Sequence, residues 1–209
     1  MSALTLLDYA SVLIFALTGA LVASRQQLDI VGFAFIACLT AVGGGTLRDV
    51  LLDRNPVFWL GNPDYVLIAC GAALLVFFTA HLVESRYRLL LWLDSFALAV
   101  AVPAGVSAAM VMAQSPVIVV LMGMVTGCMG GLMRDVVCNE VPLVLKQGEL
   151  YVTAAFAGAL GAVGAAMLSD DPLVILGTCA ALTWALRAGS LGFGWRLPVS
   201  RARPPRNRP

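Results

Sequence analysis

Four ionisable residues form two matched dipeptides inside otherwise apolar stretches of the chain. The stretch AVGGGTLRDV contains Arg48 and Asp49, and the stretch GCMGGLMRDV contains Arg134 and Asp135. A charged side chain at membrane depth costs a few kcal/mol or more, so such a residue faces a partner or a water-filled cavity. These residue types therefore suit a path for ions or polar solutes, where charges set the field or act as gates.

Two further aspartates follow short apolar runs, Asp8 after ALTLL and Asp94 after LLLWL. We predict that Asp8 lies near Arg48 and that Asp94 lies near Arg134. The two pairs would neutralise or gate opposite mouths of a path across the membrane. The alternatives are purely structural ion pairs, or side chains that reach the lipid headgroups.

Glycines precede each Arg-Asp dipeptide. The positions concerned are Gly43, Gly44, Gly45, Gly127, Gly130 and Gly131. Glycine has no Cβ, so a run of glycines weakens a helix and permits a kink or an unwound turn. A break of this kind is tolerated in a membrane only inside protein or beside a water-filled cavity. We predict kinks that shape a pore, and the alternative is close helix packing through small residues.

The sequence lacks the residue patterns of an enzyme. It has no nucleophile paired with a base, no cluster of metal ligands and no phosphate-binding loop after a strand. We therefore expect no catalytic residue, no cofactor and no metal site. The net charge of +1 also argues against nucleic-acid binding.

The composition indicates an integral membrane protein. The chain has 209 residues, of which 60% are hydrophobic and 12% charged, with a mean hydropathy of +0.92. Soluble domains have about 25% charged residues. A membrane-spanning helix needs about 20 apolar residues. We expect seven spans, at roughly 3–24, 30–52, 64–82, 89–112, 115–138, 150–168 and 172–191.

The chain also contains an internal repeat. Sliding the sequence by 86 positions superposes Asp8 on Asp94, Arg48–Asp49 on Arg134–Asp135, Gly44–Gly45 on Gly130–Gly131, Pro56 on Pro142 and Tyr65 on Tyr151. Each copy holds three spans, and an odd number of spans turns the second copy upside down. We predict an all-α fold with repeats at 1–88 and 89–169, a seventh helix at 170–195 and a disordered basic tail at 196–209.

The charges of the short loops predict the orientation in the membrane. One side carries Arg25, Arg86, Arg88, Lys146 and the Arg-rich tail, and the other carries Arg54, Gln114 and Asp170–Asp171. The basic side should be cytoplasmic, which places the N-terminus outside and the C-terminus inside. Arg187 has no partner within the last span, and we expect it to snorkel toward the cytoplasm.

The duplicated motifs resemble those of the prokaryotic TRIC (trimeric intracellular cation) channels. The resemblance rests on GGGTLRD, which continues into RDVLLDRNPVFWL, and on GGLMRD, which continues into RDVVCNEVPLVL. It covers about residues 5–190. It implies a homotrimer in which each protomer has its own pore, lined largely by the first, second, fourth and fifth spans. It also implies conduction of monovalent cations, mainly potassium, and contact with membrane lipids. Phosphoinositide control, known for animal members, is not implied here.

The sequence therefore predicts a potassium channel of a bacterial inner membrane that also passes sodium. A secondary transporter of a small solute such as glycine is the main alternative, since inverted repeats also suit alternating access and some relatives in the wider family resemble glycine transporters. A structural or assembly protein, which would carry no flux, is a third. No TVGYG-type filter is present, so we expect modest selectivity.

Overall fold

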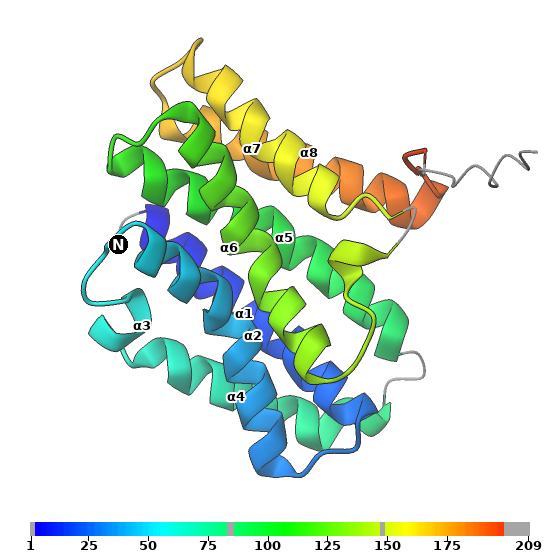
Figure 1. Cartoon of the computed structure of the whole chain (residues 1–209). Coiled ribbons are helices and arrows are strands. Elements are labelled where there is room, and N and C mark those ends of the chain that lie inside the picture. Colours follow the sequence, from blue (N-terminus) through cyan, green and yellow to red (C-terminus); the bar gives the residue numbers. More distant parts are fainter. Residues whose placement is uncertain (1–2, 83–85, 147–148, 199–209) are drawn as a thin grey trace, which may run out of the picture.

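The computed structural model describes residues 3–82, 86–146 and 149–198, and the regular secondary structure of this part of the chain is entirely helical (Figure 1). The predicted tail at 196–209 lies mostly outside the described residues. The helices are α1 (Ala3–Arg25), α2 (Ile30–Leu51), α3 (Phe58–Gly61), α4 (Asp64–Thr79), η1 (Ala80–Leu82), α5 (Arg86–Val111), α6 (Pro116–Val137), η2 (Leu143–Leu145), α7 (Val152–Ala166) and α8 (Pro172–Phe193).

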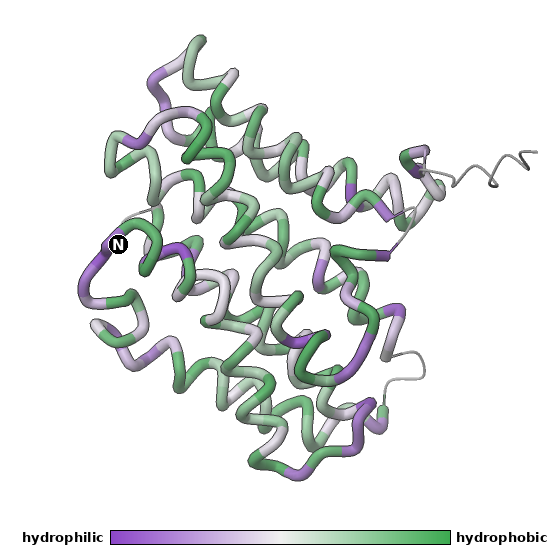
Figure 2. Tube along the Cα trace, viewed as in Figure 1, coloured by the Kyte–Doolittle hydropathy of each residue, from purple (hydrophilic) through white to green (hydrophobic). Residues whose placement is uncertain are grey.

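The seven predicted spans correspond to α1, α2, α4, α5, α6, α7 and α8. Within the described residues, six helices are long and apolar enough to cross a membrane, and α7 is shorter, at 15 residues. Large apolar side chains such as Phe35 and Leu168 are exposed on the outer surface. Figure 2 shows hydrophobic residues along the helices and many of the hydrophilic residues in the connections between them. This pattern is the one expected of a protein surrounded by lipid.

The chain is built as two inverted three-helix repeats and a seventh helix. The first repeat is α1, α2 and α4, and the second is α5, α6 and α7. Helices α1, α2, α5 and α6 form the centre of the molecule, with α4 on one side and α7 and α8 on the other (Figure 1). Helix α8 packs against α5 and α7.

The central helices α2 and α6 end in the same way, as repeats should. In α2, the backbone N–H of Leu52 donates to the Arg48 carbonyl at 3.0 Å, and Cys138 donates to the Arg134 carbonyl at 3.0 Å at the end of α6. The next residue in each copy, Asp53 or Asn139, has φ at 52°. Asparagine and aspartate tolerate this left-handed conformation, which turns the chain out of the helix.

Helices α2 and α6 cross through glycines. A Cβ built on Gly44 would lie 2.3 Å from the Thr126 carbonyl oxygen, and a Cβ on Gly130 would lie 2.4 Å from the Thr40 carbonyl oxygen. The two contacts are equivalent, since 44 and 40 become 130 and 126 when 86 is added. Residues later in α2 contact residues earlier in α6, so the two helices cross in an antiparallel sense. The repeats therefore meet as inverted copies.

The crossing bears on the predicted kinks. Both helices remain α-helical through their glycines, so no unwound turn is present at Gly43–Gly45 or Gly127–Gly131. Thr40 and Thr126 each donate a side-chain hydrogen bond to the carbonyl four residues earlier, at 2.6 and 2.7 Å. Bonds of this kind often bend a helix. A role for the glycines in bending the helices around a pore stays a prediction, and close packing is their observed contribution.

Candidate functional site

A first ion-pair cluster joins α1, α2 and the loop after α2. Arg48 donates from Nη1 to Asp8 Oδ1 at 2.8 Å and from Nε to Asp49 Oδ1 at 2.8 Å. Arg54 donates to the same oxygen of Asp49 at 2.9 Å. Arg48 and Asp49 are fully buried, and Asp8 is nearly so. We call Asp8, Arg48, Asp49 and Arg54 the first cluster.

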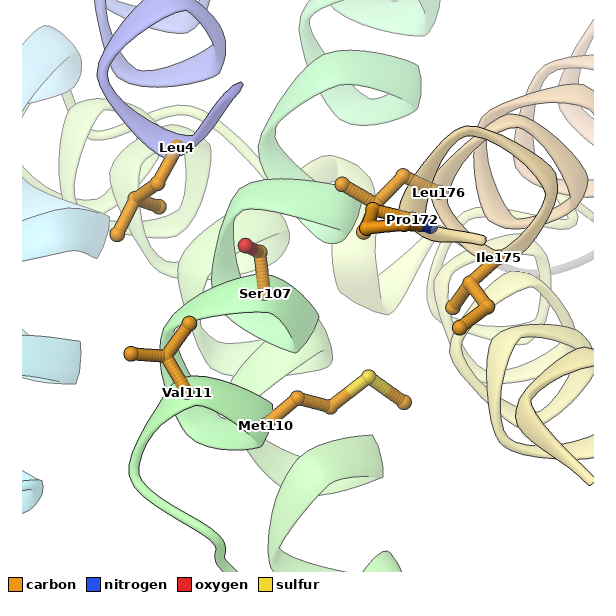
Figure 3. Close-up of a pocket in the computed structure, with 7 residues that line it drawn as sticks. All are labelled: Leu4, Ser107, Met110, Val111, Pro172, Ile175 and Leu176. Atoms are coloured by element: carbon orange, nitrogen blue, oxygen red, sulfur yellow. The ribbon is translucent and has the colours of Figure 1, made fainter. Parts of the chain in front are cut away.

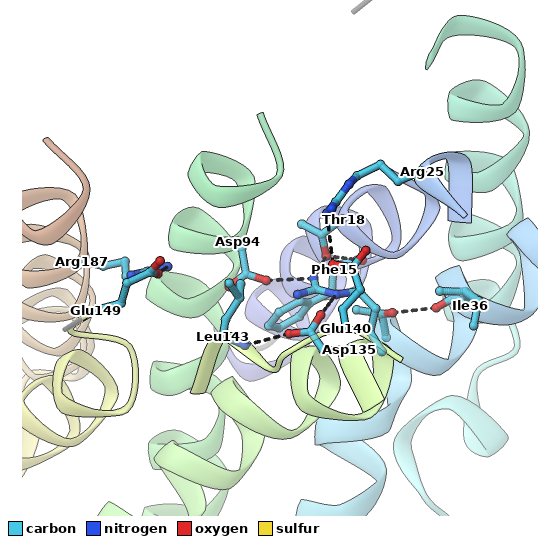
Figure 4. Close-up of polar contacts among 12 residues, drawn as sticks. Phe15, Thr18, Arg25, Ile36, Asp94, Asp135, Glu140, Leu143, Glu149 and Arg187 are labelled. Atoms are coloured by element: carbon cyan, nitrogen blue, oxygen red, sulfur yellow. Dashed lines mark hydrogen bonds and ion pairs between the residues drawn. The ribbon is translucent and has the colours of Figure 1, made fainter. Parts of the chain in front are cut away.

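A second cluster repeats this arrangement at the end of α6. Arg134 donates from Nη1 to Asp94 Oδ1 at 2.9 Å and from Nε to Asp135 Oδ1 at 2.8 Å. The same Nη1 also donates to the hydroxyl of Thr18 at 2.9 Å. Figure 4 shows Asp94, Asp135 and Thr18 converging from α5, α6 and α1. We call Asp94, Arg134 and Asp135 the second cluster.

The structure therefore contains the predicted Asp8–Arg48 and Asp94–Arg134 contacts. Their role as gates stays a prediction. Neither arginine reaches out to a lipid headgroup, because each guanidinium is buried among carboxylates. Burying a charge is tolerated when good geometry and additional hydrogen bonds offset its desolvation, and removal of one partner is then costly.

The second carboxylate oxygen of each Arg-Asp dipeptide holds the loop that follows. Asp49 Oδ2 accepts a hydrogen bond from the backbone N–H of Phe58 at 2.9 Å. Asp135 Oδ2 accepts one from the backbone N–H of Leu143, also at 2.9 Å. The aspartates thus couple the end of each central helix to the segment that folds back over it. This role was not predicted from the sequence, and the donors lie 9 and 8 residues after their aspartates, so they do not keep the constant offset of 86.

Phe58 is a further residue that the sequence analysis missed. Its ring lies 5.4 Å from the guanidinium carbon of Arg48 and would be 2.6 Å from a Cβ on Gly45. The contact with Arg48 has the geometry of a cation–π interaction. Gly45 therefore leaves the space that the Phe58 ring occupies beside the first cluster, and a larger residue there would displace the ring.

A narrow polar cavity lies beside the first cluster, at the interface between the repeats. Its volume is about 10 Å³, which is close to the space needed for one water molecule. It is lined by Asp8, Ser11, Phe15, Thr40, Ala41, Gly44, Gly45, Phe58, Ala101 and Thr126. The cavity thus brings Asp8 and two of the predicted glycines, Gly44 and Gly45, together with hydroxyl groups from both repeats.

The other predicted glycines lie away from this cavity's walls. A Cβ on Gly43 would meet the sulfur of Met133 at 2.9 Å, and one on Gly127 would meet Val102 at 2.6 Å. Gly131 borders the hydroxyl of Tyr151, at 3.2 Å from its would-be Cβ. Only Gly44 and Gly45 of the predicted set line the cavity, and Gly130 meets α2 at the crossing.

Arg187 contradicts the expectation that it snorkels to the membrane surface. Its side chain is fully buried, and its Nη2 donates to Glu149 Oε2 at 2.8 Å. Glu149 lies just before α7, in the second repeat. The partner lies outside the last helix and becomes adjacent only through the packing of α8, so the sequence of that helix gave no sign of it.

The larger hollows of the described structure are apolar. The pocket in Figure 3 has a volume of about 490 Å³ and is lined by Ser107 and six apolar residues of α1, α5 and α8. Ser107 is the one polar residue in this lining, and no charged side chain lines the pocket. Among the described residues, no three His, Cys, Asp or Glu side chains are arranged to hold a metal ion.

Comparison with known proteins identifies the family. A family model described as "Glycine transporter" matches the chain twice, at residues 5–81 and 91–167. The two matches are offset by the same 86 residues as the repeat. A crystal structure of the trimeric intracellular cation channel orthologue from Rhodobacter sphaeroides is 42% identical, with a TM-score of 0.89, over 93% of this chain and all of that one.

The chain belongs to the prokaryotic TRIC family.

Two other relatives agree with this assignment. A TRIC cation channel structure is 29% identical, with a TM-score of 0.85, over 96% of this chain and 98% of the other. The UPF0126 inner membrane protein YadS of Escherichia coli K12 is 39% identical over 158 residues, which is 74% of each chain. The solved TRIC relatives are channels and not enzymes, which agrees with the sequence prediction for this chain. The predicted inner-membrane location agrees with the name of the Escherichia coli relative.

Proposed function

We propose that this TRIC-family protein is a channel for monovalent cations, chiefly potassium and also sodium, in a bacterial inner membrane. We propose further that it works as a homotrimer with one pore in each protomer. The observation that carries the proposal is the polar cavity at the repeat interface, which Asp8 of the first buried Asp–Arg cluster lines. The second repeat contains an equivalent buried cluster. The 42% identical Rhodobacter sphaeroides relative is named a trimeric cation channel, which supports the same function.

The charges of the site favour a cation over an anion. Arginines beside a pore would repel potassium if they were unpaired. In both clusters the arginine faces two carboxylates, so its charge is compensated. The cavity itself presents the carboxyl group of Asp8 and the side-chain oxygens of Ser11, Thr40 and Thr126. Oxygen atoms are the ligands that alkali cations take in selective pores.

The described conformation corresponds to a closed channel in this proposal. A cavity of about 10 Å³ admits about one water molecule and is too narrow for a hydrated ion to pass. Opening would widen this cavity through movement of Phe58 or of the helices α1, α2, α5 and α6, which together form its walls. Since the loop that carries Phe58 is held by Asp49, the first cluster would control this movement.

The orientation is part of the proposal. The basic loops at Arg25, Arg88 and Lys146 would face the cytoplasm, with the N-terminus outside and the C-terminus inside. Cysteine substitution at the exposed Gln114 and at the exposed Gln27, followed by labelling of intact cells with a membrane-impermeant maleimide, tests this arrangement. Labelling at 114 and not at 27 is expected, and the reverse pattern would overturn the orientation.

The main test is flux through the purified protein in liposomes. We expect potassium to move rapidly down its gradient and to collapse a diffusion potential, without saturation at low millimolar concentration. The matched variants are Asp8→Asn in the cavity wall and Asp64→Asn at the exposed start of α4. The first should change the flux and the second should not. Absence of potassium flux through the wild-type protein would overturn the channel proposal.

Secondary transport of glycine is the second candidate, favoured by the description of the matching family model. Inverted repeats that meet at a closed central cavity also suit alternating access. Labelled glycine offered to the same liposomes separates the two functions. Saturable glycine exchange without potassium conductance would support a carrier and would make the cavity at Thr40 and Thr126 part of its substrate site.

A further inference from the structure

Two cysteine thiols of the first repeat lie in contact between α2 and α4. The Sγ atoms of Cys38 and Cys70 are 3.8 Å apart, and either thiol can donate a weak hydrogen bond to the other. Both cysteines are free and half-buried, whereas Cys128 and Cys179 are buried. The site is therefore a pair of reduced thiols that face each other across two membrane-spanning helices.

Small residues beside this pair allow the two helices to approach closely. Ala37 and Ala69, which directly precede the two cysteines in sequence, are fully buried, and helices α2 and α4 pack against each other. Small residues at a helix interface reduce the distance between the backbones. A disulfide bond joins its sulfur atoms at about 2.0 Å. The sulfur atoms, now at 3.8 Å, have to approach by about 1.8 Å, which rotation about the Cα–Cβ bonds can supply.

The thiol pair lies beside the apolar outer surface of the molecule. Phe35, three residues before Cys38, is exposed, and so is Leu74, four residues after Cys70. Residues three or four apart lie on the same side of a helix. In a membrane this surface faces acyl chains and not water. A reagent that reaches the thiols from this side must therefore dissolve in the hydrocarbon of the bilayer.

The second repeat has no equivalent of this thiol pair. Adding 86 to 38 and 70 gives Met124 and Phe156. Both side chains line an apolar pocket beside α6 and α7. Neither a thioether nor a phenyl ring can form a disulfide. A bond between Cys38 and Cys70 would therefore fix one helix pair of the first repeat and leave α6 and α7 without a matching link.

Helices α2 and α4 connect the thiol pair to the polar cavity. Thr40 and Ala41, two and three residues after Cys38, line that cavity. Tyr65 of α4 meets the ring of Phe58, another residue of the cavity wall, edge-on with ring centres 4.8 Å apart. A covalent bond between α2 and α4 would tie these parts of the wall together. It would thus restrict the movement of α2 and Phe58 by which the cavity is proposed to widen.

We propose that Cys38 and Cys70 form a reversible disulfide when an apolar organic hydroperoxide oxidises them, and that this bond locks α2 to α4 in the described conformation. Formation of the bond stands on the contact between the two thiols. Its effect on potassium flux rests on the proposed function, because only then does the polar cavity belong to a conducting path.

The reaction has two steps and consumes one hydroperoxide. The thiolate of one cysteine attacks the terminal oxygen of the hydroperoxide, so that the O–O bond breaks and a sulfenic acid forms. The proton released from this thiol completes the departing alcohol. The sulfur of the other cysteine then attacks the sulfenic sulfur, so that the S–S bond forms and the hydroxyl group leaves with the second thiol proton as water. The two sulfur atoms together lose two electrons, and the hydroperoxide gains them.

The test is a peptide map of the purified protein in liposomes. The protein is treated with cumene hydroperoxide, the remaining free thiols are blocked with N-ethylmaleimide, and the digest is analysed by mass spectrometry without reductant. We expect a linked pair of peptides that contain residues 38 and 70, which dithiothreitol separates. Both thiols carrying the maleimide, or each oxidised to a sulfinic acid without a link, would overturn the proposal.

Serine variants identify the partners of the bond. Cys38→Ser and Cys70→Ser should each lack the linked peptides. Cys138→Ser is the matched control, because it removes another half-buried thiol and should retain the link. A link from Cys38 or Cys70 to Cys138 in the wild-type protein would overturn the assignment. The wild-type map decides the bond even where a serine variant fails to fold.

Two further measurements test whether the bond locks the native packing. Oxidation should raise the melting temperature of the wild-type protein by about 5 °C or more, because the bond closes a long loop in the unfolded chain. A lower melting temperature would show that the native packing does not accommodate the bond, and would overturn the lock.

Potassium flux through the same liposomes separates this inference from the proposed function. Oxidation should reduce the wild-type flux severalfold, dithiothreitol should restore it, and Cys70→Ser should be insensitive to both reagents. A flux that formation of the disulfide leaves unchanged would overturn the lock. A wild type without flux in either state would defeat the channel, and the peptide map would still decide the disulfide.

Discussion

Thr18 accepts a hydrogen bond from Nη1 of Arg134 at 2.9 Å, and this bond joins the first repeat to the charged end of the second. It has no equivalent at Arg48, because Ala104 stands where the symmetry of the repeat would require a second threonine. The hydroxyl of Thr18 is itself fixed by donating to the Phe15 carbonyl at 2.8 Å. The two clusters are therefore alike in plan but differ in this contact between the repeats.

Replacing Thr18 by valine should weaken the second cluster. The substitution keeps the shape of the side chain and removes the acceptor, which leaves a buried donor of Arg134 with one partner fewer. We expect a loss of about 1–3 kcal/mol in the free energy of unfolding. Thr79→Val is the control, because the Thr79 hydroxyl bonds only to its own helix at an exposed position. Equal melting temperatures for the two variants would contradict the role given to Thr18.

Alanine at Gly44 or Gly130 should force the two repeats apart at their crossing. The added Cβ would lie 2.3 or 2.4 Å from a carbonyl oxygen of the other helix, and a backbone atom cannot rotate away. We expect each substitution to destabilise the protein by about 1–3 kcal/mol. Gly71→Ala, which has open space around the new Cβ, should be neutral or stabilising. Thermal unfolding in detergent distinguishes these outcomes, and full tolerance at Gly44 and Gly130 would contradict the close crossing.

Asp8→Asn should reduce potassium flux severalfold. The change leaves Arg48 and Arg54 with Asp49 as their only carboxylate in the first cluster, so the cluster beside the cavity becomes formally positive. A positive wall repels cations and favours anions. Parallel potassium and chloride flux measurements should show the first falling relative to the second. An unchanged ratio would mean that the Asp8 carboxyl group does not face the conducting path.

Phe58→Ala should increase flux if this ring closes the cavity. The substitution removes the ring from the surface of Gly45 and from its contact with Arg48, and it retains the backbone bond of residue 58 to Asp49. Trp59→Phe provides a control, since Trp59 bonds to Thr46 and does not line the cavity. A flux through Phe58→Ala at or below the wild-type value, in a folded protein, would show that the closure lies elsewhere.

Breaking the Asp94–Arg134 pair should be more damaging than any of these changes. Arg134→Met leaves Asp94 and Asp135 buried without a cation in contact, and loss of one partner of a buried pair costs about 3–5 kcal/mol. Arg25→Met breaks the partly exposed pair with Glu140 and should cost at most about 1 kcal/mol. Comparable losses for the two variants would mean that the second cluster is hydrated and weakly coupled.

The sequence by itself determined the plan of this protein. Hydropathy marks the spans because a helix that crosses a membrane must satisfy its backbone internally and present apolar side chains to lipid. The constant offset of 86 establishes the inverted repeat. The matched positions of Asp8, Arg48, Asp94 and Arg134 on adjacent spans were enough to predict the two ion pairs, since a charge at membrane depth needs a partner within reach.

Only the tertiary structure decided how the copies differ. Thr18, Phe58 and Arg187 acquire their roles from contacts between elements distant in sequence, which depend on the depth and rotation of each helix against its neighbours. No local pattern encodes these quantities, because side-chain packing sets them for the whole assembly of helices at once. The repeat therefore predicted the similarity of the two clusters, and the packing of α1 and α3 decided their asymmetry.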